Sequence, residues 1–339
     1  MNSETALVSS NTLHLRHLTV SPPVALAPMV GLSHSAMRSM LLSIGGVGLL
    51  YTEMLAARHI PHENPQSSPF LVRGKDENPL VYQIYISDEK YVPETVKKLE
   101  LIGADGIDIN LGCPAPQVRR SGAGAFLAED QQTVRKIVGK MRKSTELPIS
   151  AKIRLGRTLD RQKLINFCRM LEGEGIDMIA AHARLHGEKF CRTPRWAWVG
   201  HVKECVKIPV LANGGIFSIE DARRCLEVTG ADGLMLGRGA IENPFLMKEI
   251  GENIFGAEKS DCVVSAQDHY IRFIELLEDR FALERRLGRL KQYTHYFSRA
   301  FKFGHQLATT IQKSENIEDA KEKAGQFFAR NKPDMFFPS

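Results

Sequence analysis

The 339-residue sequence lacks the long apolar runs that a membrane-spanning helix requires. No stretch reaches the roughly 18–20 uninterrupted apolar residues needed to cross a bilayer. The N-terminal segment, residues 1–12, is polar, and it lacks the basic stretch and apolar stretch that begin a secretory signal peptide. We therefore expect a protein that is neither embedded in a membrane nor exported.

Closely spaced cysteines are also missing. The six cysteines show no CxxC pairing, and they are Cys113, Cys168, Cys191, Cys205, Cys225 and Cys262. Disulfide frameworks and zinc sites both depend on regular cysteine spacing, so we expect reduced thiols, a cytoplasmic location and no metal site. The net charge of +6 is mild, and it agrees with a polyanionic partner without establishing one.

What the sequence does contain is a short apolar run, repeated eight times and followed each time by a loop and an amphipathic helix. The runs are Val24–Ala27, Gly48–Tyr51, Leu80–Tyr85, Gly106–Ile109, Ile149–Ile153, Met178–Ala181, Val210–Ala212 and Gly233–Leu236. Short strands that are buried on both faces lose their polar alternation. Eight such units over roughly 215 residues predict an α/β fold, a parallel (β/α)₈ TIM barrel. An open doubly wound sheet is the alternative, weakened because no GxGxxG follows the first run.

The pattern divides the chain into two predicted domains. Residues 1–245 form the barrel, preceded by an alternating segment, residues 13–20, that we expect to be a small strand over its lower opening. Residues 246–339 form an all-helical domain. Its predicted helices are Gln267–Arg280, Ala282–Ala300 and Glu318–Arg330.

Residues 285–314 contain no acidic side chain, although seven basic and five aromatic residues occur there. The aromatic residues are Tyr293, Tyr296, Phe297, Phe301 and Phe303, and the basic ones include Arg286 and Lys291. One interpretation is an aromatic helical core with a solvated basic face. The missing acidic residues favour the other, a surface that binds nucleic acid.

Polar or glycine-rich groups follow nearly every predicted strand. In a TIM barrel such groups meet at the C-terminal ends of the strands, where the active site forms. These groups are Pro28 and Met29, Glu53, Gln83, Asn110 with Cys113, Lys152 with Arg154, His182 with Arg184, Asn213 with Gly214 and Gly215, and Gly237 with Arg238. A single site to which many loops contribute residues explains this placement.

The loops after two neighbouring predicted strands indicate a phosphate site. Gly214-Gly215 and Gly237-Arg238-Gly239 follow the seventh and eighth runs, and each precedes a helical turn. The loops after strands seven and eight commonly bind phosphate in this fold, and Arg238 adds a fixed cation. Two ordinary tight turns are the alternative interpretation.

A phosphate in these loops leaves the rest of the ligand over the barrel mouth. Gln83, Asn110, Lys152 and His182 would surround it, and this set of donors with one cation suits a flavin ring. Lys152 is the predicted cation beside the ring. A lysine that ends a buried strand and pairs with a carboxylate is the alternative, although buried lysines are rare.

Cys113 lies beyond the fourth run, between Gly112 and Pro114, in a loop directed at the same site. Most cysteines are inert, and only this position distinguishes Cys113 from the others. A free thiol has a pKa near 8.5, so it is protonated at neutral pH and can serve as a general acid. The glycines that follow predict a loop that moves over a substrate.

Together these segments resemble the tRNA-dihydrouridine synthase family, most closely its bacterial B-type branch. The matching segments, in order, are Ala27-Pro28-Met29, Thr52-Glu53-Met54, Gln83, Asp108-Ile109-Asn110-Leu111-Gly112-Cys113-Pro114, Lys152-Ile153-Arg154, His182-Ala183-Arg184, Asn213-Gly214-Gly215-Ile216 and Gly237-Arg238-Gly239. The resemblance implies an FMN-binding TIM barrel, a helical tRNA-recognition domain and NADPH as reductant, in a protein that we expect to be a monomer. The expected reaction is reduction of uridine in tRNA to 5,6-dihydrouridine.

The resemblance also implies roles for single residues. Cys113 would be the proton donor. The flavin would be bound by Pro28, Met29, Gln83, Lys152, His182, Asn213, Gly214, Gly215, Gly237 and Arg238. Asn110 would contact the flavin or the target uracil, and Arg184 would approach the RNA. From their charge and position we also expect RNA contacts from Arg154, Arg119, Arg120, Arg286 and Lys291.

Two other functions share some of these features. An FMN barrel that reduces a free pyrimidine or a small enone would use the same cofactor and a cysteine acid, but it would not need the basic helices. An RNA-binding protein without chemistry would not need Cys113 or Lys152. Both therefore explain less of the sequence.

Overall fold

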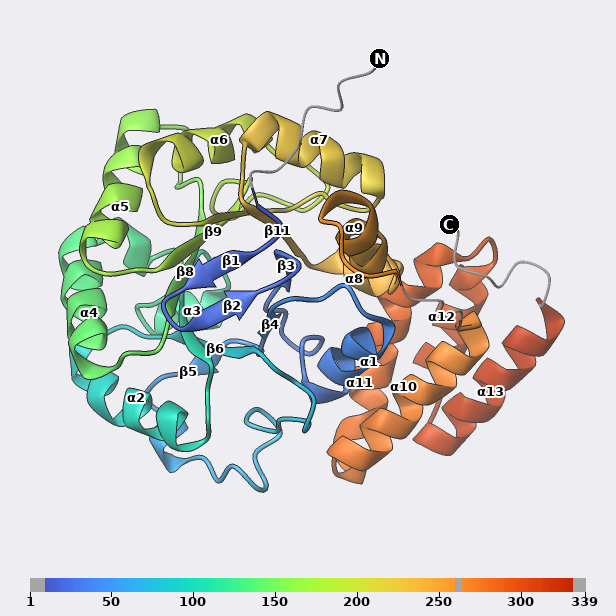
Figure 1. The fold of residues 1–339 in the computed structure, drawn as a ribbon. Helices are drawn as coiled ribbons and strands as arrows, with labels where there is room; N and C mark the ends of the chain where they lie inside the picture. Colours follow the sequence, from blue (N-terminus) through green and yellow to red (C-terminus); the bar gives the residue numbers. More distant parts are fainter. Residues whose placement is uncertain (1–9, 260–263, 332–339) are drawn as a thin grey trace, which may run out of the picture.

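The computed structural model describes residues 10–259 and 264–331, so Cys262 lies outside the described residues. Eight parallel strands form the centre of the molecule (Figure 1). They are β3 (Val24–Leu26), β4 (Leu50–Tyr51), β6 (Leu80–Tyr85), β7 (Gly106–Leu111), β8 (Ile149–Arg154), β9 (Met178–His182), β10 (Val210–Asn213) and β11 (Gly233–Leu236). Each predicted apolar run overlaps one of them, which confirms the eight-unit prediction.

The sheet closes on itself. Its strand order is β3-β11-β10-β9-β8-β7-β6-β4, and an additional short strand, β5 (Leu55–Ala56), pairs with β6. A parallel bridge between Ala25 and Leu49 joins the two ends of this order. The amide of Leu26 donates to the carbonyl of Leu49 at 3.0 Å. A TIM barrel is therefore confirmed, and the open doubly wound sheet is wrong.

The segment before the barrel is an antiparallel hairpin rather than the single strand expected. Strands β1 (Leu13–Leu15) and β2 (Leu18–Val20) lie across the end of the barrel where the strands begin, at the front of Figure 1. Leu13, Leu15 and Val20 pack against apolar side chains from the strands. The hairpin therefore closes the barrel at the end opposite the C-terminal strand ends.

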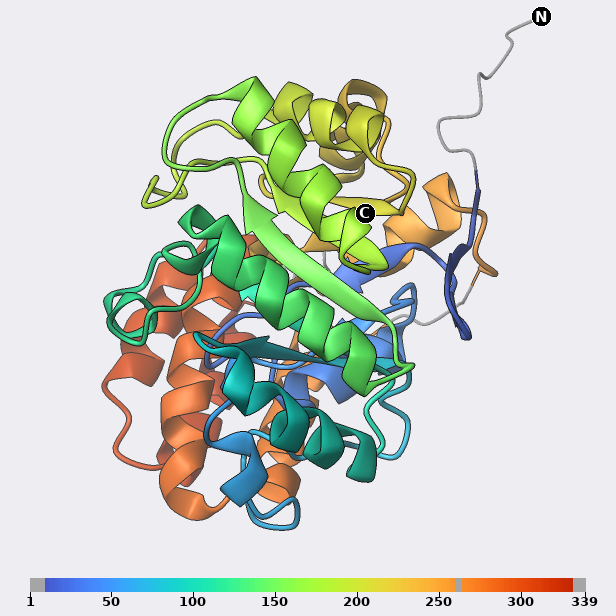
Figure 2. The same cartoon turned by 90° about the vertical axis from the view of Figure 1, so that its left-hand side faces the viewer.

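Helices surround the barrel (Figure 2). They are α1 (Ser35–Ile44), α2 (Val92–Leu101), α3 (Pro116–Arg120), α4 (Gln131–Ser144), α5 (Arg161–Gly173), α6 (Trp196–Cys205), α7 (Ile219–Thr229), α8 (Arg238–Glu242) and α9 (Leu246–Ile254). Side chains cap several of the starts, because the first helical amides have no partner within the helix. Asp130, Asp160 and Ser218 each accept a hydrogen bond from the amide three residues on.

The C-terminal region is helical, as expected. It contains α10 (Ala266–Arg280), α11 (Leu283–Phe297), α12 (Gly304–Gln312) and α13 (Ile317–Arg330), beside α1 at the right of Figure 1. Helix α12 was not predicted, because Leu307 and Ile311 are its only large apolar residues and give a short apolar pattern. Helix α9 contacts the barrel, where Arg223 donates to the Asn253 carbonyl at 3.1 Å. The domain boundary after residue 245 stays a prediction.

The aromatic residues of the basic window divide between core and surface. Tyr293 and Phe297 are fully buried, and their ring centroids lie 5.0 Å apart. Phe301 is also buried, whereas Phe303 is exposed. The core interpretation therefore holds for most of these rings. The exposed cations of the same window, such as Lys302, remain available to a partner.

No helix within residues 10–259 and 264–331 is long and apolar enough to cross a membrane. The five cysteines in this part of the chain are all free thiols.

Candidate functional site

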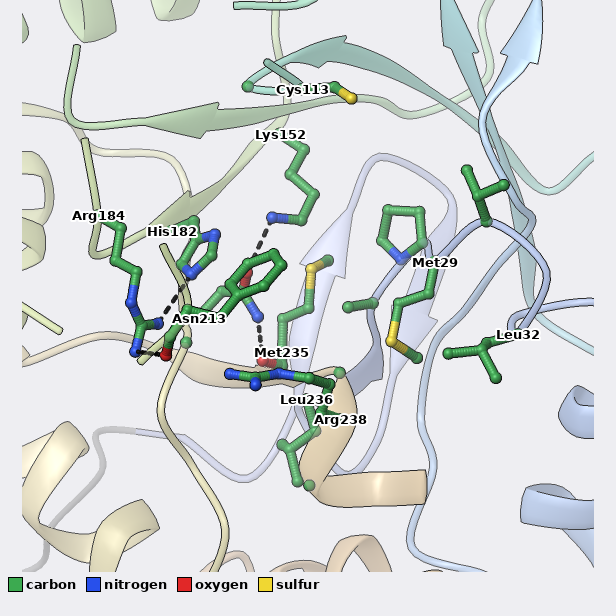
Figure 3. A pocket seen from close by; sticks show the side chains of 18 of the residues that line it. Met29, Leu32, Cys113, Lys152, His182, Arg184, Asn213, Met235, Leu236 and Arg238 are labelled. Carbon is green, nitrogen blue, oxygen red and sulfur yellow. Dashed lines mark hydrogen bonds between the residues drawn. The ribbon is translucent and has the colours of Figure 1, made fainter. Parts of the chain in front are cut away.

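A cavity of about 320 Å³ opens at the C-terminal ends of the barrel strands (Figure 3). Fourteen of the predicted site residues line it: Pro28, Met29, Gln83, Asn110, Cys113, Lys152, Arg154, His182, Arg184, Asn213, Gly214, Gly215, Gly237 and Arg238. These residues come from seven different strand exits. The structure therefore brings together in one place what the sequence spreads over more than 200 residues.

The cavity lining is strongly cationic. Lys152, Arg154, Arg184 and Arg238 line it, and no Asp or Glu does among the residues that the structure describes. Like charges held close together repel one another, and a bound anion offsets that repulsion. The lining therefore favours an anionic ligand such as a phosphate ester.

Lys152 lies on the cavity floor in a fixed position. Its Nζ donates to Asn213 Oδ1 at 2.8 Å, and Asn213 Nδ2 donates to the Met235 carbonyl at 2.6 Å (Figure 3). Burial, with a smaller contribution from Arg154, lowers the Lys152 pKa to about 8. The ammonium is therefore mostly charged at neutral pH but loses its proton more readily than an exposed lysine.

His182 is neutral in this setting. Burial, followed by repulsion from Lys152 and Arg154, holds its pKa well below the ordinary value. The guanidinium of Arg184 lies 3.1 Å from His182 Nε2. Because a guanidinium can only donate, Nε2 accepts this bond and the ring proton resides on Nδ1.

Arg184 also holds the loop that follows β9. Its NH2 group donates to the carbonyls of Arg192 at 2.6 Å and Phe190 at 3.1 Å. Phe190 is half exposed within the cavity, and its ring stacks on His182 with 6.0 Å between centroids. Arg184 was predicted to contact RNA. In the structure its guanidinium supports the cavity wall instead, and an RNA contact stays a prediction.

The two glycine loops are built for close approach. Gly214 and Gly215 have φ angles of +106° and +77°, in the left-handed region that favours glycine. A Cβ on Gly214 would lie 2.5 Å from His182 Cδ2. Beside these loops the Arg238 guanidinium lies over Phe190 at 4.8 Å and over Phe217 at 5.3 Å. The first loop thus has a backbone that requires glycine, and Arg238 places one oriented cation beside it.

Cys113 is anchored through its backbone. Its amide donates to Asn110 Oδ1 at 2.9 Å, and its carbonyl accepts the Ala125 amide at 3.0 Å. A Cβ on Gly124, which has a φ of +66°, would lie 2.6 Å from the Cys113 carbonyl oxygen. The glycine here therefore allows the loop to fold tightly. Movement of this loop over a substrate stays a prediction.

Four of the predicted RNA-contacting residues lie outside the cavity. Arg119 and Arg120 are exposed on α3, in the loop that carries Cys113. Arg286 donates to the carbonyls of Phe281 and Glu278, at the end of α10. Lys291 donates to the Ser314 carbonyl at 2.8 Å. Arg286 and Lys291 thus have structural partners, and the RNA contacts of all four stay predictions.

The sequence did not reveal the contribution of helix α11 to the cavity. Gln292 and Tyr296 line the cavity from this helix, and Gln292 Nε2 donates to the Val30 carbonyl at 2.8 Å. No local motif marks these two residues, because their role depends on how the helical region packs against the loop after β3. Phe190 and Phe217 were missed for a similar reason, since both lie in irregular loops.

Comparison with protein-family models gives a match to dihydrouridine synthase (Dus) over residues 25–330. The tRNA-dihydrouridine(16) synthase of Aquipseudomonas alcaligenes is 31% identical over 304 residues, which cover 87% of this chain and 96% of that protein. A probable tRNA-dihydrouridine synthase 1 from Synechocystis sp. is 27% identical over 96% of this chain and 92% of that protein.

Solved structures of other enzymes share the barrel. Histamine dehydrogenase from Rhizobium sp. 4-9 superposes with a TM-score of 0.56 at 13% identity, covering 81% of this chain and 51% of that one. 2-Naphthoyl-CoA reductase superposes with a TM-score of 0.53 at 11% identity, covering 73% of this chain and 52% of that one. This chain spans about half the length of both, and the likeness shows the fold alone.

The match to the family model covers most of the chain, from the second residue of β3 through the other barrel strands to the end of α13. It agrees with the resemblance seen in the strand-end segments, although the B-type branch stays a prediction. The chain belongs to the dihydrouridine synthase family.

Proposed function

We propose that this protein is a tRNA-dihydrouridine synthase that binds FMN, uses NADPH as reductant and protonates uracil from Cys113. The cationic cavity without carboxylates, with Cys113 at its rim, is the observation that supports this proposal most strongly. Family membership and the names of the relatives support an oxidoreductase that acts on tRNA.

The residues of the cavity fit FMN. Arg238 and the two glycine loops would hold the phosphate, since a guanidinium and backbone amides both bind phosphate oxygens. Lys152 would lie near the ring, together with Gln83 and His182. When bound, the flavin supplies a hydride, and a cation at Lys152 favours its reduced, anionic form.

Cys113 would complete the reduction of uracil. The C5–C6 double bond of uracil is conjugated to the C4 carbonyl, so C6 accepts the hydride and negative charge develops at C5 and O4. A proton from the Cys113 thiol neutralises C5, and the thiolate regains a proton from solvent. Two electrons from NADPH and two protons in total then balance the conversion to 5,6-dihydrouridine.

A uridine within folded tRNA must leave its stack to enter the cavity. Arg154 lies in the cavity, and Arg119 and Arg120 lie on the neighbouring loop, where they can bind the backbone phosphates. The exposed cations of the helical region extend this surface. We expect a monomer, because one tRNA would occupy much of it, and a cytoplasmic protein, where tRNA and NADPH are available.

The test is an assay on purified protein with FMN, NADPH and an unmodified tRNA transcript, in parallel with free uridine and uracil. We expect dihydrouridine in the tRNA, detected by mass spectrometry, and little turnover of the free compounds. Reduction of free pyrimidine alone would instead establish the small-substrate enzyme. Nucleotide 16 of the tRNA should be examined first, because several relatives are named tRNA-dihydrouridine(16) synthase.

A further inference from the structure

Asp108 is a fully buried carboxylate beneath the cavity, and it is not among the residues that line it. It lies on β7 opposite Gln83 of β6 and Ser150 of β8 in the strand register. Residues in register on neighbouring strands point to the same side of a sheet. The three side chains therefore meet inside the barrel. Burying a carboxylate costs free energy unless hydrogen bonds or an opposite charge compensate for the lost water.

Hydrogen bonds connect this carboxylate to Cys113. Gln83 Nε2 donates to Asp108 Oδ2 at 2.7 Å. Asn110 Nδ2 donates to Gln83 Oε1 at 2.8 Å. Asn110 Oδ1 then accepts the amides of Cys113 at 2.9 Å and of Gly112 at 3.3 Å. We name Asp108, Gln83 and Asn110 the amide bridge, because two side-chain amides join a carboxylate to a backbone.

The direction of every bond in the amide bridge is determined by its two ends. An ionised carboxylate can only accept, so Gln83 turns its NH2 group toward Asp108 and its oxygen toward Asn110. A backbone amide can only donate, so Asn110 turns its oxygen toward Cys113 and its NH2 group toward Gln83. Rotating either amide by half a turn would place like groups against each other. The bridge therefore has one favourable arrangement.

Burial raises the Asp108 pKa to about 6, and the hydrogen bonds from Ser150 and Gln83 and the charge of Lys152 oppose that rise. At neutral pH the carboxylate is mostly ionised, so both of its oxygens can accept. Ser150 Oγ donates to Asp108 Oδ1 at 2.5 Å and lies 3.3 Å from the Tyr51 hydroxyl. The lower end of the bridge is thus held by a second set of contacts that do not involve the cavity.

We propose that Asp108 is a positioning residue, which orients Gln83 and Asn110 toward the ligand and fixes the backbone of Cys113. This inference rests on the proposed function, because it concerns the same cavity. Both amide oxygens are used inside the bridge. Gln83 keeps one N–H for the cavity that both residues line, whereas the Asn110 amide also donates to Met54 Sδ at 3.7 Å. This wall then favours a ligand edge that carries oxygen acceptors, as flavin and uracil both do.

The test measures FMN affinity of the apoprotein by quenching of flavin fluorescence. Asp108→Ala removes the acceptor, and we expect it to weaken FMN binding by about tenfold or more, the usual cost of a disrupted buried hydrogen bond. In a Gln83→Ala background the same substitution should change affinity by less than about twofold, because Asp108 acts through Gln83. Asp108→Asn should restore most of the affinity, since its amide oxygen can still accept.

A matched control is Asp232→Asn, which changes a carboxylate at the start of β11 that binds Lys203 and the Val210 amide, away from the cavity. It should lower the melting temperature and leave FMN affinity unchanged. If Asp108→Ala does not fold, Asp108→Leu removes the acceptor with a side chain of similar size and the same expected loss.

Two results would overturn the inference. One is an equal loss of affinity in the wild-type and Gln83→Ala backgrounds, which indicates a general structural role. The other is an Asp108→Asn protein as weak as Asp108→Ala, which assigns the effect to charge. Failure of the wild-type protein to bind FMN would contradict the proposed function itself, so the two failures are distinguishable.

Discussion

At the scale of single residues, Cys113 differs from the other described cysteines in having both its backbone groups held beside a cationic cavity. Cys168 and Cys225 are buried within helices, and Cys191 is an exposed loop thiol. Position in the fold, rather than the thiol alone, therefore suits Cys113 to donate a proton.

Substitution Cys113→Ala should lower dihydrouridine formation by about 100-fold or more, because general acid catalysis typically contributes that much. FMN content and oxidation of NADPH should remain, since neither needs the thiol. Product analysis by mass spectrometry with a parallel absorbance assay measures both. Cys191→Ala is the matched control and should be fully active. Normal product formation by Cys113→Ala would remove this thiol from the mechanism.

The lowered pKa of Lys152 predicts that the rate of flavin reduction depends on pH. Its pKa is lowered to about 8, so the ammonium is present below that pH and is lost above it. Reduction of the flavin by NADPH should therefore slow by up to about tenfold per pH unit above pH 8. Stopped-flow absorbance measures this rate, and Lys152→Met should be slow with no step near pH 8. If the rate of Lys152→Met still fell near pH 8, another group would be responsible for the pH dependence. Lys140→Met, which changes an exposed lysine, is the control.

Much of the site could be predicted from the sequence, because TIM-barrel strands place their last residues at one end. That rule placed Gln83, Lys152 and His182 around one cavity, which they line in the structure, while their contacts with a flavin stay a prediction. It could not locate Phe190 or Gln292, which reach the cavity through loop shape and helix packing. It also could not show that Arg286 binds backbone carbonyls, since a charge pattern does not reveal its partners.

At the scale of secondary-structure elements, the hairpin β1–β2 and helix α11 act at opposite ends of the barrel. The hairpin covers the apolar interior where the strands begin. Helix α11 touches the loop after β3 and completes the cavity at the other end. The sequence predicted a cover for the lower opening but not a hairpin, because eight residues of alternating pattern fit either form.

The hairpin should contribute to stability alone. Leu15 is only 3% exposed, and Leu15→Ala should lower the free energy of unfolding by about 2–4 kcal/mol. His14 lies on the exposed side of the same strand, so His14→Ala should change stability little. Chemical denaturation measures both values. A loss of FMN affinity in folded Leu15→Ala would contradict the assignment of the hairpin to stability alone.

Helix α11 should affect the cofactor directly. Gln292→Ala removes the hydrogen bond to the Val30 carbonyl, and Val30 lines the cavity, so FMN affinity should fall by about fivefold. Titration of the apoprotein with FMN measures this change. Gln306→Ala, on the exposed face of α12, is the matched control. Equal affinities in the two variants would show that α11 does not support the cofactor wall.

At the scale of the whole molecule, the cationic cavity, the exposed arginines of α3 and the basic helical region predict an electrostatic contribution to RNA binding. Protein cations that neutralise phosphates release counterions from RNA, so affinity falls steeply as salt rises. Binding of tRNA should therefore weaken strongly between low and physiological salt, as measured by filter binding. A tRNA affinity that does not change with salt would favour the alternative function, an enzyme that reduces a free pyrimidine or a small enone.

Reduction of uridine in tRNA is the central activity that we propose for this protein. Nucleoside mass spectrometry of tRNA from cells that lack the gene tests it most directly. We expect at least one dihydrouridine to be replaced by uridine, a mass lower by two hydrogens, and to return with the wild-type gene but not with Cys113→Ala. Unchanged dihydrouridine at every tRNA position would contradict the account.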